Sequence, residues 1–472
     1  MLQPKTDRPR KAMVCPTHRA LVCWKFGLSD PIHIIGAGLA GCEAAWQIAR
    51  RGLRCTLHEM RPVRPTAAHQ TDRLAELVCS NSLKSETEST APWLLKQELR
   101  RLGSLLLEAA ARARVPGGQA LTVDRGVFAN EVTAAIAAEP LIDVRREEVT
   151  AIPAEPIVIV ATGPLTSDAL AKDIARLTGS ERLFFYDAIS PIVDADSVDT
   201  SVAFWASRYG KSVDSTGDYL NCPLDREQYE RFVDALLVAQ PVTAHIEEDR
   251  TPFFEACLPI EELARRGRET LRFGPMKPVG LSDPRTGRRP YAAVQLRQES
   301  LRARSFNLVG FQNHMKFSDQ ARVLRMIPGL ETAEFLRFGQ IHRNTYINAP
   351  ALLSVTLQLR AVPRVFFAGQ ISGVEGYVEA ISTGLMAGVH AAALAAQETP
   401  RALPRQTALG SLCHYIAGAD PANYQPANIT FDLLPALDEA TGQRLHHDKK
   451  ARHAEVCWRA LVALEEYRHA YV

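Results

Sequence analysis

Three cysteines of this chain stand in local sequences that could activate a thiol, and the first is Cys257. It precedes Leu258 and Pro259, and proline favours the first position of a helix. The partial positive charge of a helix N-terminus lowers the pKa of a nearby thiol, although Glu261 and Glu262 in the first turn would oppose that effect. A cysteine outside a disulfide is more often a small packing residue. The local sequence therefore leaves two interpretations of Cys257, a nucleophile and a packing residue.

Cys79 and Cys222 are the other two candidates. Cys79 is followed directly by a polar turn, Ser80-Asn81-Ser82. Cys222 precedes a predicted helix cap at Asp225, and Gln228 follows three residues later, as in a capping box. Packing remains the alternative role for both thiols. We expect the remaining cysteines to be structural: Cys15, Cys23, Cys42, Cys55, Cys413 and Cys457.

The composition is that of an ordinary soluble globular protein. The 472 residues are 46% hydrophobic and 23% charged, with a net charge of +2, so a nucleic-acid partner would have to be bound by a local basic patch. The nine cysteines include no CxxC pair, which argues against a disulfide framework or a zinc site. We therefore predict a reducing, cytoplasmic setting and no metal. No apolar run approaches the roughly 20 residues of a membrane span.

A βαβ unit at residues 31–60 is the first element that would position these thiols. The sequence predicts a buried strand at 32–35, a glycine turn G-x-G-x-x-G that opens a helix, and a second strand ending at Glu59. Such a turn lets the backbone approach a pyrophosphate at the helix N-terminus, and the acid accepts a hydrogen bond from a ribose. We therefore predict a dinucleotide site formed by Gly36, Ala37, Gly38, Leu39, Ala40, Gly41 and Glu59.

An S-adenosylmethionine fold also combines a glycine turn with an acid at a strand end, but two later segments weigh against it. Residues 157–163 predict an apolar strand ending in Ala-Thr-Gly, a junction common in two-segment FAD domains. Residues 365–388 predict a strand, a glycine-rich turn and a helix of small residues, which would bring a second helix N-terminus to the flavin. Glycines used only for tight packing are the alternative. At this flavin end we predict Gly369, Gln370, Gly373 and Gly376.

FAD domains of this type are discontinuous in sequence, and the stretch near 195–330 lacks the glycine fingerprint. We therefore predict an α/β fold, in which a Rossmann-like FAD-binding domain carries an inserted α+β domain. The predicted ranges are a disordered leader or start-site artefact at 1–30, FAD-binding segments at 31–195 and 330–436, the insertion at 196–329, and a C-terminal helix at 437–472.

Arginines cluster in the predicted insertion, at residues 264–280 and 283–291. With Phe273 and Tyr291 nearby, they suit a phosphate backbone and an unstacked base. A solvated arginine face is the alternative. The polar run at 342–345 could line a pocket over the flavin or form a capped turn.

Seven blocks of the chain together resemble the folate- and FAD-dependent tRNA (uracil-5-)-methyltransferases, the TrmFO family. They are IIGAGLAGCEAAWQIARRG, EMRPVRPTAAHQTDRLAELVCSNSLKS, NCPLDREQYERF, FFEACLPIEELARRG, LRFGPMKPVGL, NLVGFQNHMKFSDQARVLRMIPGLE and FFAGQISGVEGYVEA. The resemblance extends from about Pro31 to the C-terminus and rests on long, specific motifs. The MnmG flavoproteins resemble the chain more distantly, since they share the FAD fold but are longer.

The resemblance implies methylation of C5 of the T-loop uridine of tRNA. It also implies 5,10-methylenetetrahydrofolate as the carbon donor, reduced FAD as the reductant and NAD(P)H as the source of electrons for the flavin. Uracil C5 becomes nucleophilic only after a thiolate adds to C6, and a base must later remove the C5 proton. In this family the nucleophile corresponds to Cys257 and the proposed base to Cys79, whereas Cys222 matches a third cysteine without an assigned role.

The remaining site predictions concern substrates. We predict that Arg343 and Asn344 bind flavin or folate, and that Arg265, Arg266 and Lys277 contact RNA.

Two features depart from the family pattern. Ala256 replaces the glycine that usually precedes the nucleophile, and alanine would strain the loop if that position required a positive φ. Residues 1–30 also lie outside the pattern. Two alternative functions stay open: the same chemistry on a ribosomal RNA uridine, and a flavin-stabilised RNA-binding or chaperone protein without catalysis.

Overall fold

The computed structural model describes residues 31–66, 68–154, 156–179, 183–188, 190–211, 217–242, 258–300, 302–339, 341–422 and 424–471. For residues 183–188 and 341–343 the description covers the backbone alone. The predictions for residues 1–30, Ala256 and Cys257 lie outside the described residues, and they stay predictions.

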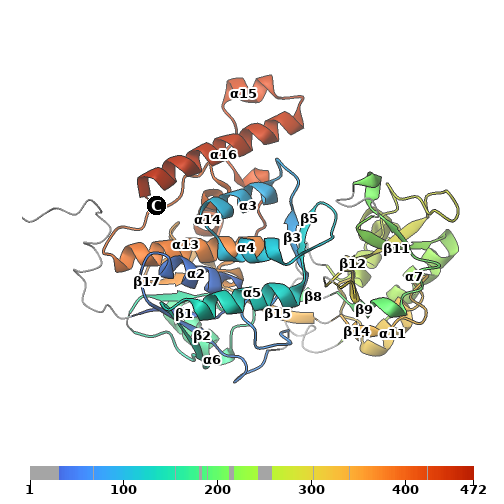
Figure 1. The fold of residues 1–472 in the computed structure, drawn as a ribbon, viewed down its shortest axis with the longest axis horizontal. Coiled ribbons are helices and arrows are strands. Elements are labelled where there is room, and N and C mark those ends of the chain that lie inside the picture. The colour runs from blue at the N-terminus through green and yellow to red at the C-terminus, as the bar shows by residue number, and fades with distance from the viewer. Residues whose placement is uncertain are drawn as a thin grey trace, which may run out of the picture.

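A six-stranded sheet forms the base of the larger domain (Figure 1). Its order is β16-β17-β7-β1-β2-β6, and every pairing is parallel except that of β16 with β17. The strands are β1 (Ile32–Ile35), β2 (Cys55–Glu59), β6 (Ile142–Arg146), β7 (Val158–Val160), β16 (Gln358–Leu359) and β17 (Val362–Phe367). The central strand β7 is apolar and buried throughout, as expected of a parallel strand covered on both faces. The pairing of β17 with β7 joins the two predicted segments and confirms the discontinuous, Rossmann-like fold.

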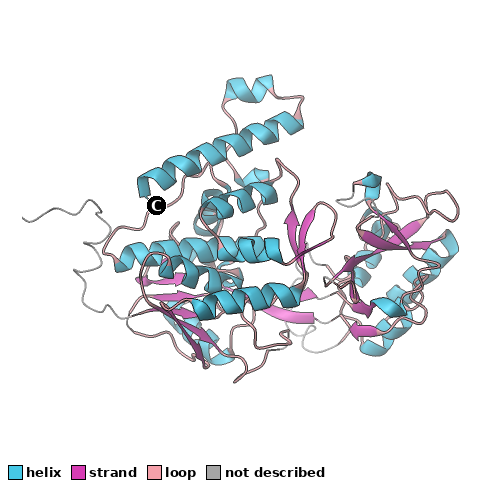
Figure 2. Ribbon diagram, in the orientation of Figure 1, coloured by secondary structure: helices cyan, strands magenta, loops and turns pink. Residues whose placement is uncertain are grey.

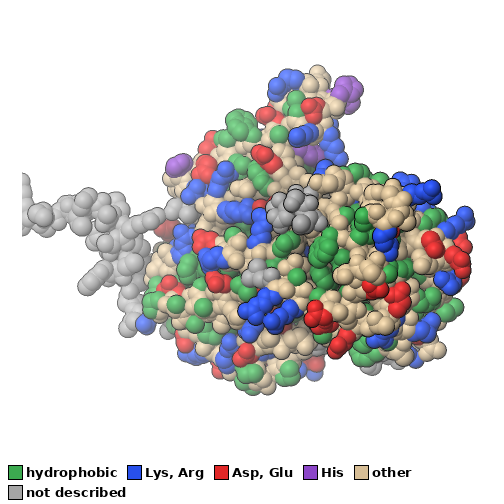
Figure 3. All heavy atoms as spheres, turned by 45° about the vertical axis from the view of Figure 1, so that its right-hand side comes forward, with side chains coloured by type: hydrophobic (Ala, Val, Ile, Leu, Met, Phe, Trp, Pro, Cys, Tyr) green, Lys and Arg blue, Asp and Glu red, His purple; other side chains and the backbone are tan. Residues whose placement is uncertain are grey.

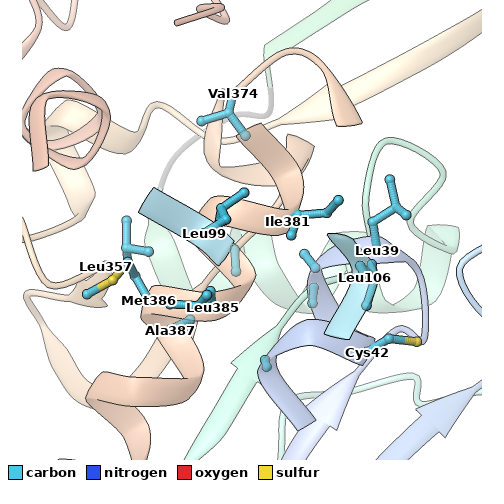
Figure 4. Packing of buried hydrophobic residues seen from close by; sticks show 14 of the residues in the cluster. Leu39, Cys42, Leu99, Leu106, Leu357, Val374, Ile381, Leu385, Met386 and Ala387 are labelled. Atoms are coloured by element: carbon cyan, nitrogen blue, oxygen red, sulfur yellow. The ribbon is translucent and has the colours of Figure 1, made fainter. Parts of the chain in front are cut away.

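Helices α2 (Leu39–Ala49) and α13 (Tyr377–Ala395) pack against each other beside this sheet. Gly384 and Gly388 permit the contact, since a Cβ at either position would overlap the backbone of α2. Figure 4 shows buried apolar side chains around this contact, including Leu39, Cys42, Ile381 and Leu385. The two helices that follow the glycine turns are therefore held at a fixed distance by their small residues.

Helix α13 is, among the described residues, the one helix long and apolar enough to cross a membrane. Glu379 and His390 interrupt its apolar sequence. Of the apolar stretch of α13 that is long enough to span a membrane, 72% is buried inside the protein. A helix that is apolar on all sides is expected at the centre of a large domain as well as in a membrane.

Further helices and a three-stranded sheet complete the larger domain (Figure 2). The small sheet has the order β3-β5-β4. These elements are β3 (Ser82–Ser85), β4 (Arg114–Val115), β5 (Ala120–Val123), α3 (Ala91–Arg101), α4 (Leu105–Arg112), α5 (Arg125–Ala138), α6 (Asp168–Thr178), α12 (Ala349–Leu352) and α14 (Ala408–Gly418). Thr90, Ser104 and Asp124 cap α3, α4 and α5 by accepting hydrogen bonds from first-turn N–H groups.

The inserted domain is built on a second six-stranded sheet, at the right of Figure 1. Its order is β10-β11-β12-β13-β9-β14, and all neighbours are antiparallel. The elements are β9 (Ile192–Asp194), β10 (Phe204–Ala206), β11 (Tyr219–Leu224), α7 (Arg226–Val238), α9 (Ile260–Arg265), α10 (Thr270–Phe273), β12 (Ala292–Gln298), β13 (Ser305–Leu308), α11 (Phe317–Leu324) and β14 (Phe335–Arg337). One face of the sheet packs apolar side chains such as Leu220 and Leu296 into the domain core. The other face carries Asn221 and Arg297, because successive side chains of a strand alternate between faces.

The insertion is wider than the predicted range 196–329. Strand β9 begins before this range and β14 lies after it, yet both pair within the inserted sheet. Each of these strands has three residues, too few for a periodic pattern to reveal them in sequence. Outside both large sheets, β8 (Leu183–Ala188) and β15 (Ile341–Tyr346) form an antiparallel pair.

The predicted single C-terminal helix at 437–472 is wrong in one respect. Two helices occupy this region, α15 (Glu439–Arg444) and α16 (Lys449–Tyr471), and they project from the larger domain at the top of Figure 1. Asp438 caps α15 through a hydrogen bond from the Thr441 N–H. The carboxylate of Asp448 accepts a hydrogen bond from the Ala451 N–H at the start of α16. Two Asp caps therefore divide the region into two helices.

Candidate active site

A cavity of about 380 Å³ lies in the larger domain, where α2 and α13 begin. Its wall combines residues from both FAD-type segments, and Gln312 joins it from the inserted domain. Of the residues predicted from the sequence, the wall contains Gly36, Ala37, Gly38, Leu39, Ala40, Glu59, Cys79, Gly369, Gln370 and Gly376. The fold therefore brings together, at one cavity, residues that lie more than 300 positions apart in the sequence.

The first glycine turn has the shape that a pyrophosphate cradle needs. Gly36 has φ +102°, and a Cβ on Gly41 would stand 1.8 Å from the Gly36 carbonyl oxygen, so both positions require glycine. Gly38 instead faces open space, with no atom within 4 Å of where a Cβ would lie. Backbone N–H groups at the start of α2 thus border the cavity beside room for a ligand. This cradle fits the diphosphate of a dinucleotide.

Glu59 ends β2 at the cavity, as predicted, but it has a protein partner that the sequence did not reveal. The Arg61 guanidinium donates to both carboxylate oxygens, at 2.9 and 3.1 Å, and the Arg61 N–H donates at 2.9 Å. Burial alone would raise the pKa of Glu59, but the hydrogen bonds and charge of Arg61 outweigh it and hold the pKa below its ordinary value. Glu59 is therefore an ionised acceptor, and its second oxygen accepts only one of these bonds.

The second glycine turn places Gly369 and Gly376 at the cavity, whereas Gly373 lies elsewhere. A Cβ on Gly373 would stand 2.1 Å from the hydroxyl oxygen of Tyr424, whose O–H donates to the Ser372 carbonyl at 2.8 Å. Gly373 is thus needed for packing against Tyr424, which is the alternative that the sequence left open for these glycines. Gln370 lines the cavity and donates to Glu375 at 2.6 Å.

Lys84 is a cavity residue that sequence reasoning missed. Its ammonium donates to Glu379 and to Asn428, both at 2.5 Å. Glu379 is fully buried near the start of α13, and its second carboxylate oxygen has no partner. No local pattern indicates this cluster, because Lys84 and Glu379 are 295 residues apart.

Cys79 lies in the cavity wall, in a loop that several groups hold in place. The Tyr377 hydroxyl accepts hydrogen bonds from the N–H groups of Cys79 and Ser80, at 2.8 and 3.0 Å. The Arg125 guanidinium donates to the Cys79 carbonyl at 2.9 Å and forms an ion pair with Glu299 at 2.6 Å. Cys79 is partly exposed, and it belongs to the lining of the cavity.

Cys222 has a different environment. It lies on the core face of β11, fully buried, and burial together with the negative charge of Glu331 raises the pKa of its thiol. The predicted capping box does form, since Asp225 and Gln228 exchange both hydrogen bonds at the start of α7. This cap orders the helix but leaves Cys222 inside the core. The structure therefore supports a packing role for Cys222.

The helix start behind Cys257 is weaker than the sequence predicted. Pro259 is the N-cap residue of α9 rather than its first helical residue, and α9 has only six residues. Glu261 accepts a hydrogen bond from the His314 N–H at 2.8 Å, and Glu262 pairs with Arg265. The N-terminus of a short helix with two carboxylates in its first turn does little to stabilise a thiolate.

The predicted RNA-contact residues lie in the inserted domain, away from the cavity wall. Most arginines of this cluster have acidic or aromatic partners: Arg265 with Glu262, Arg268 with Asp234, Arg272 with Glu269 and Tyr291, and Arg285 with Asp283. Figure 3 shows acidic and basic side chains side by side on the outer edge of this domain. Phe273 is 81% exposed. The surface is thus mixed in charge, with Lys277 half-buried and an exposed aromatic ring nearby.

Arg343 and Asn344 belong to β15. The side chain of Arg343 lies outside the described residues, whereas Asn344 is fully buried and neither atom of its amide has a hydrogen-bond partner. The next residue, Thr345, donates its N–H to the carbonyl of Pro164, which lines the cavity. Asn344 therefore adjoins a residue that contacts the cavity wall, and its amide has no hydrogen-bond partner among the described residues.

Comparison with known proteins places this geometry in a family. The family model "Glucose inhibited division protein A" matches residues 31–399. The chain is 78% identical over 445 residues to methylenetetrahydrofolate–tRNA-(uracil-5-)-methyltransferase TrmFO of Solibacter usitatus, covering 94% of this chain and 100% of that protein. It is 64% identical over 431 residues to the protein of the same name from Koribacter versatilis, covering 91% and 96%.

A solved structure supports the fold. The form II crystal structure of Aquifex aeolicus GidA aligns with a TM-score of 0.65 and 16% identity, covering 93% of this chain and 75% of that chain. At this identity the likeness concerns the fold alone. The near full-length relatives at 78% and 64% identity show that the chain belongs to the TrmFO family.

Proposed function

We propose that this protein methylates C5 of the T-loop uridine of tRNA, with 5,10-methylenetetrahydrofolate as the carbon donor. The observation that carries the proposal is the position of Cys79, a partly exposed residue in the wall of the cavity that the glycine turns border. The names of two relatives at 78% and 64% identity support the RNA class and the carbon donor. We assign the reaction to the cytoplasm, with NAD(P)H as the source of reducing equivalents.

The residues around the cavity suit FAD. The start of α2 at Gly38 would bind the pyrophosphate, Glu59 would accept a hydrogen bond from the ribose, and Gly369, Gln370 and Gly376 would border the flavin. When bound, reduced FAD supplies the hydride that converts the transferred methylene group into a methyl group. The chain's contribution is to bind this cofactor, exclude water and hold the uracil ring beside it.

Two thiols act on the uracil ring in this proposal. The thiolate of Cys257 adds to C6, and the resulting enolate attacks the methylene carbon from C5, so that this carbon's bond to one folate nitrogen breaks. Cys79, as a thiolate, removes the proton from C5, which breaks the bond from the methylene carbon to the second folate nitrogen and releases tetrahydrofolate. Addition of the hydride to the exocyclic methylene group left at C5 then forms the methyl group and expels the Cys257 sulfur from C6. The hydrogen bonds from Cys79 and Ser80 to Tyr377 fix the loop that carries this base.

The substrate contacts follow the sequence predictions. Arg265, Arg266 and Lys277 bind the RNA, and Arg343 and Asn344 bind flavin or folate. The unsatisfied amide of Asn344 supports the second assignment, since a buried amide without partners is expected to gain them from a ligand. Replacing Arg265 and Arg266 by Gln should weaken RNA binding and leave the flavin absorbance unchanged. Loss of the flavin spectrum would make these arginines structural.

One assay separates the proposal from its two alternatives. The purified protein is incubated with FAD, NADPH, methylenetetrahydrofolate and either unmodified tRNA or ribosomal RNA, and 5-methyluridine is mapped. We expect methylation of the tRNA T-loop alone. Product on ribosomal RNA only, or RNA binding without any product, would favour one of the alternatives. A requirement for S-adenosylmethionine would contradict the proposal.

The role of Cys257 needs its own test. RNA containing 5-fluorouridine should form a covalent adduct with the protein, because fluorine at C5 cannot be removed as a proton. We expect the adduct to be lost in Cys257→Ala and retained in Cys222→Ala. An adduct that survives Cys257→Ala would exclude this residue as the nucleophile.

A further inference from the structure

The inserted sheet carries a row of polar side chains on the face opposite its apolar core. Strand pairing aligns Tyr219 with Arg297, Arg297 with Asn307, Asn307 with Ile192 and Ile192 with Arg337. Residues paired in antiparallel strands point to the same face, and the strand neighbours Leu296 and Leu308 point into the core. The row therefore places two arginines and one asparagine together across four neighbouring strands.

A β-bulge is what brings Arg337 into this row. Phe335 pairs with Val193 on the core face, while Arg337 pairs with Ile192, so the register shifts by one residue between the two strands. Without the shift, Arg337 would share the face of Phe335 and would point into the apolar core. Bulges commonly redirect a side chain in this way beside functional sites.

The row faces the loop that carries Cys79. The Arg297 guanidinium donates to the Ser80 hydroxyl at 2.8 Å, and the Tyr219 hydroxyl donates to the Gly117 carbonyl of the larger domain at 3.0 Å. A thiolate at Cys79 would raise the pKa of both Arg297 and Arg337. The two arginines thus lie at the junction of the domains, beside the thiol assigned as the base.

Four N–H-bearing nitrogens of this row are buried without a hydrogen-bond partner in the described part of the chain: Arg297 Nε, Asn307 Nδ2, Arg337 Nε and Arg337 Nη2. The neighbouring row on the same face is different. There, Gln295 donates to Asn221 at 2.9 Å, and Asn221 donates to three backbone carbonyls. Buried polar groups in folded proteins are normally paired, so the contrast between the two rows singles out the first one.

Both the type of these groups and their charge indicate the ligand. All four nitrogens are donors, so the missing partner is an acceptor. Among the described side chains, Glu299 is the carboxylate whose charge acts on all three guanidinium groups, those of Arg125, Arg297 and Arg337. Burial and the positive charge of Arg125 lower the pKa of Arg337, although the negative charge of Glu299 acts against them. Guanidinium groups match the oxygens of phosphates and carboxylates in geometry as well as in charge.

We propose that Arg297, Asn307 and Arg337 form a binding site for an oxyanion of a substrate, either a phosphate of the RNA or a glutamyl carboxylate of the folate. The choice of RNA and folate as the two sources rests on the proposed function, in which both substrates must reach Cys79. The site itself, with its donors and its excess of positive charge, does not depend on which source supplies the oxyanion.

Inorganic sulfate tests the site without any reaction. Thermal unfolding of the FAD-loaded protein is measured in sulfate and in chloride at equal ionic strength. The wild-type Tm should rise with the logarithm of sulfate concentration. Arg337→Gln should abolish this rise. Arg337→Lys keeps the positive charge but lacks the planar N–H donors of a guanidinium group, so it should reduce the rise. Arg322→Gln is the control, because Arg322 lies on α11 with a 50% exposed side chain paired with Asp319.

Asn307→Asp tests the same site when Arg337→Gln fails to fold. The new carboxylate would lie between the two arginines and accept from the unpaired donors, so Tm without sulfate should rise and the response to sulfate should disappear. A lowered Tm with an unchanged sulfate response would overturn the proposal. So would a wild-type protein whose Tm is the same in sulfate and in chloride.

Binding measurements identify the source of the oxyanion. If it is a phosphate, Arg337→Gln should raise the Kd for tRNA about tenfold and reduce the salt slope by about one, with folate affinity unchanged. If it is a carboxylate, the Kd for 5-formyltetrahydrofolate should rise about tenfold, and an analogue without glutamate should bind both proteins equally. No difference from Arg322→Gln in either titration would overturn the proposal. A failure of the proposed function is separate: the wild-type protein would make no methyluridine, while the sulfate response would persist.

Discussion

Cys79 is followed by a polar turn and Cys222 by a helix cap, but the two thiols lie in opposite environments. Cys222 lies on the core face of β11 among apolar side chains, and burial holds its pKa well above the ordinary value. Cys79 lies in a loop at the cavity, and hydrogen bonds from its backbone to Tyr377 and from Arg125 fix this loop. A turn or helix cap beside a thiol therefore says little about its reactivity. The face and layer to which the fold assigns the residue decide it.

The largest difference between the two thiols should be in catalysis. Cys79→Ala should lower the rate of methyl transfer by about 10²–10⁴-fold, the usual contribution of a general base. Cys222→Ala should leave the rate of methyl transfer unchanged, because Cys222 has no access to the cavity. Single-turnover methylation of unmodified tRNA measures both. Equal losses of methyl-transfer rate in the two variants would contradict the assignment of a catalytic role to Cys79 alone of these two thiols.

Thiol reactivity should differ next most strongly. Each unit of pKa changes the thiolate fraction tenfold, so the buried Cys222 should react with iodoacetamide at least about a hundredfold more slowly than Cys79. Raising the pH from 7 to 9 increases the thiolate fraction of an ordinary cysteine. The thiolate fraction of Cys222 should stay negligible over this range, because its raised pKa lies beyond it. Mass spectrometry of alkylated peptides resolves the two sites, and rapid modification of Cys222 in the folded protein would contradict its burial.

The support of the Cys79 loop should show a smaller effect. Tyr377→Phe removes the oxygen that accepts two backbone N–H groups, which should cost about 1–3 kcal/mol of stability and lower the methylation rate about tenfold. Tyr415→Phe is the matched control, since its hydroxyl donates to Gln425 away from the cavity. Denaturant unfolding and methylation kinetics give the two readouts. A Tyr377 variant with normal kinetics would show that the loop needs no such support.

The smallest predicted effect concerns stability. Here substitution of Cys222 should have the larger effect, whereas substitution of Cys79 has the larger effect on catalysis. Cys222→Ser places a hydroxyl in an apolar core and should cost about 1–3 kcal/mol of stability, whereas Cys79→Ser at a partly exposed site should cost about 0.5 kcal/mol or less. Urea unfolding of the FAD-loaded proteins compares them directly. A greater loss of stability at Cys79 than at Cys222 would contradict the assigned environments.

The sequence predicted the features that depend on local spacing. The glycine turn at Gly36 and Gly41, the strand that ends at Glu59, and the capping box of α7 each lie within a short stretch, so their patterns are visible without the fold. The family blocks also led to Cys79, which lines the cavity as a candidate base requires. The insertion as a separate domain followed from the absence of a glycine fingerprint.

The missed features depend on distant contacts. Lys84 meets Glu379 across 295 positions, and Arg337 joins the polar row only because a bulge shifts the register of β14. Gly373 was assigned to the flavin, but its contact with Tyr424 comes from a segment 51 residues away. The acidic partners of Arg265 and Arg272, by contrast, lie three residues before them and were overlooked in the sequence. A basic cluster should therefore be assessed together with its neighbouring acids.

The central claim is that Cys79 at the cavity is the base of a folate-dependent methyl transfer. The most direct measurement uses methylenetetrahydrofolate labelled in its methylene carbon, with FAD-loaded wild-type protein or Cys79→Ser and unmodified tRNA. The label should appear in 5-methyluridine of the T-loop with the wild-type protein and be almost absent with Cys79→Ser. Full transfer of label by Cys79→Ser, or unlabelled methyluridine from the wild-type protein, would contradict the account.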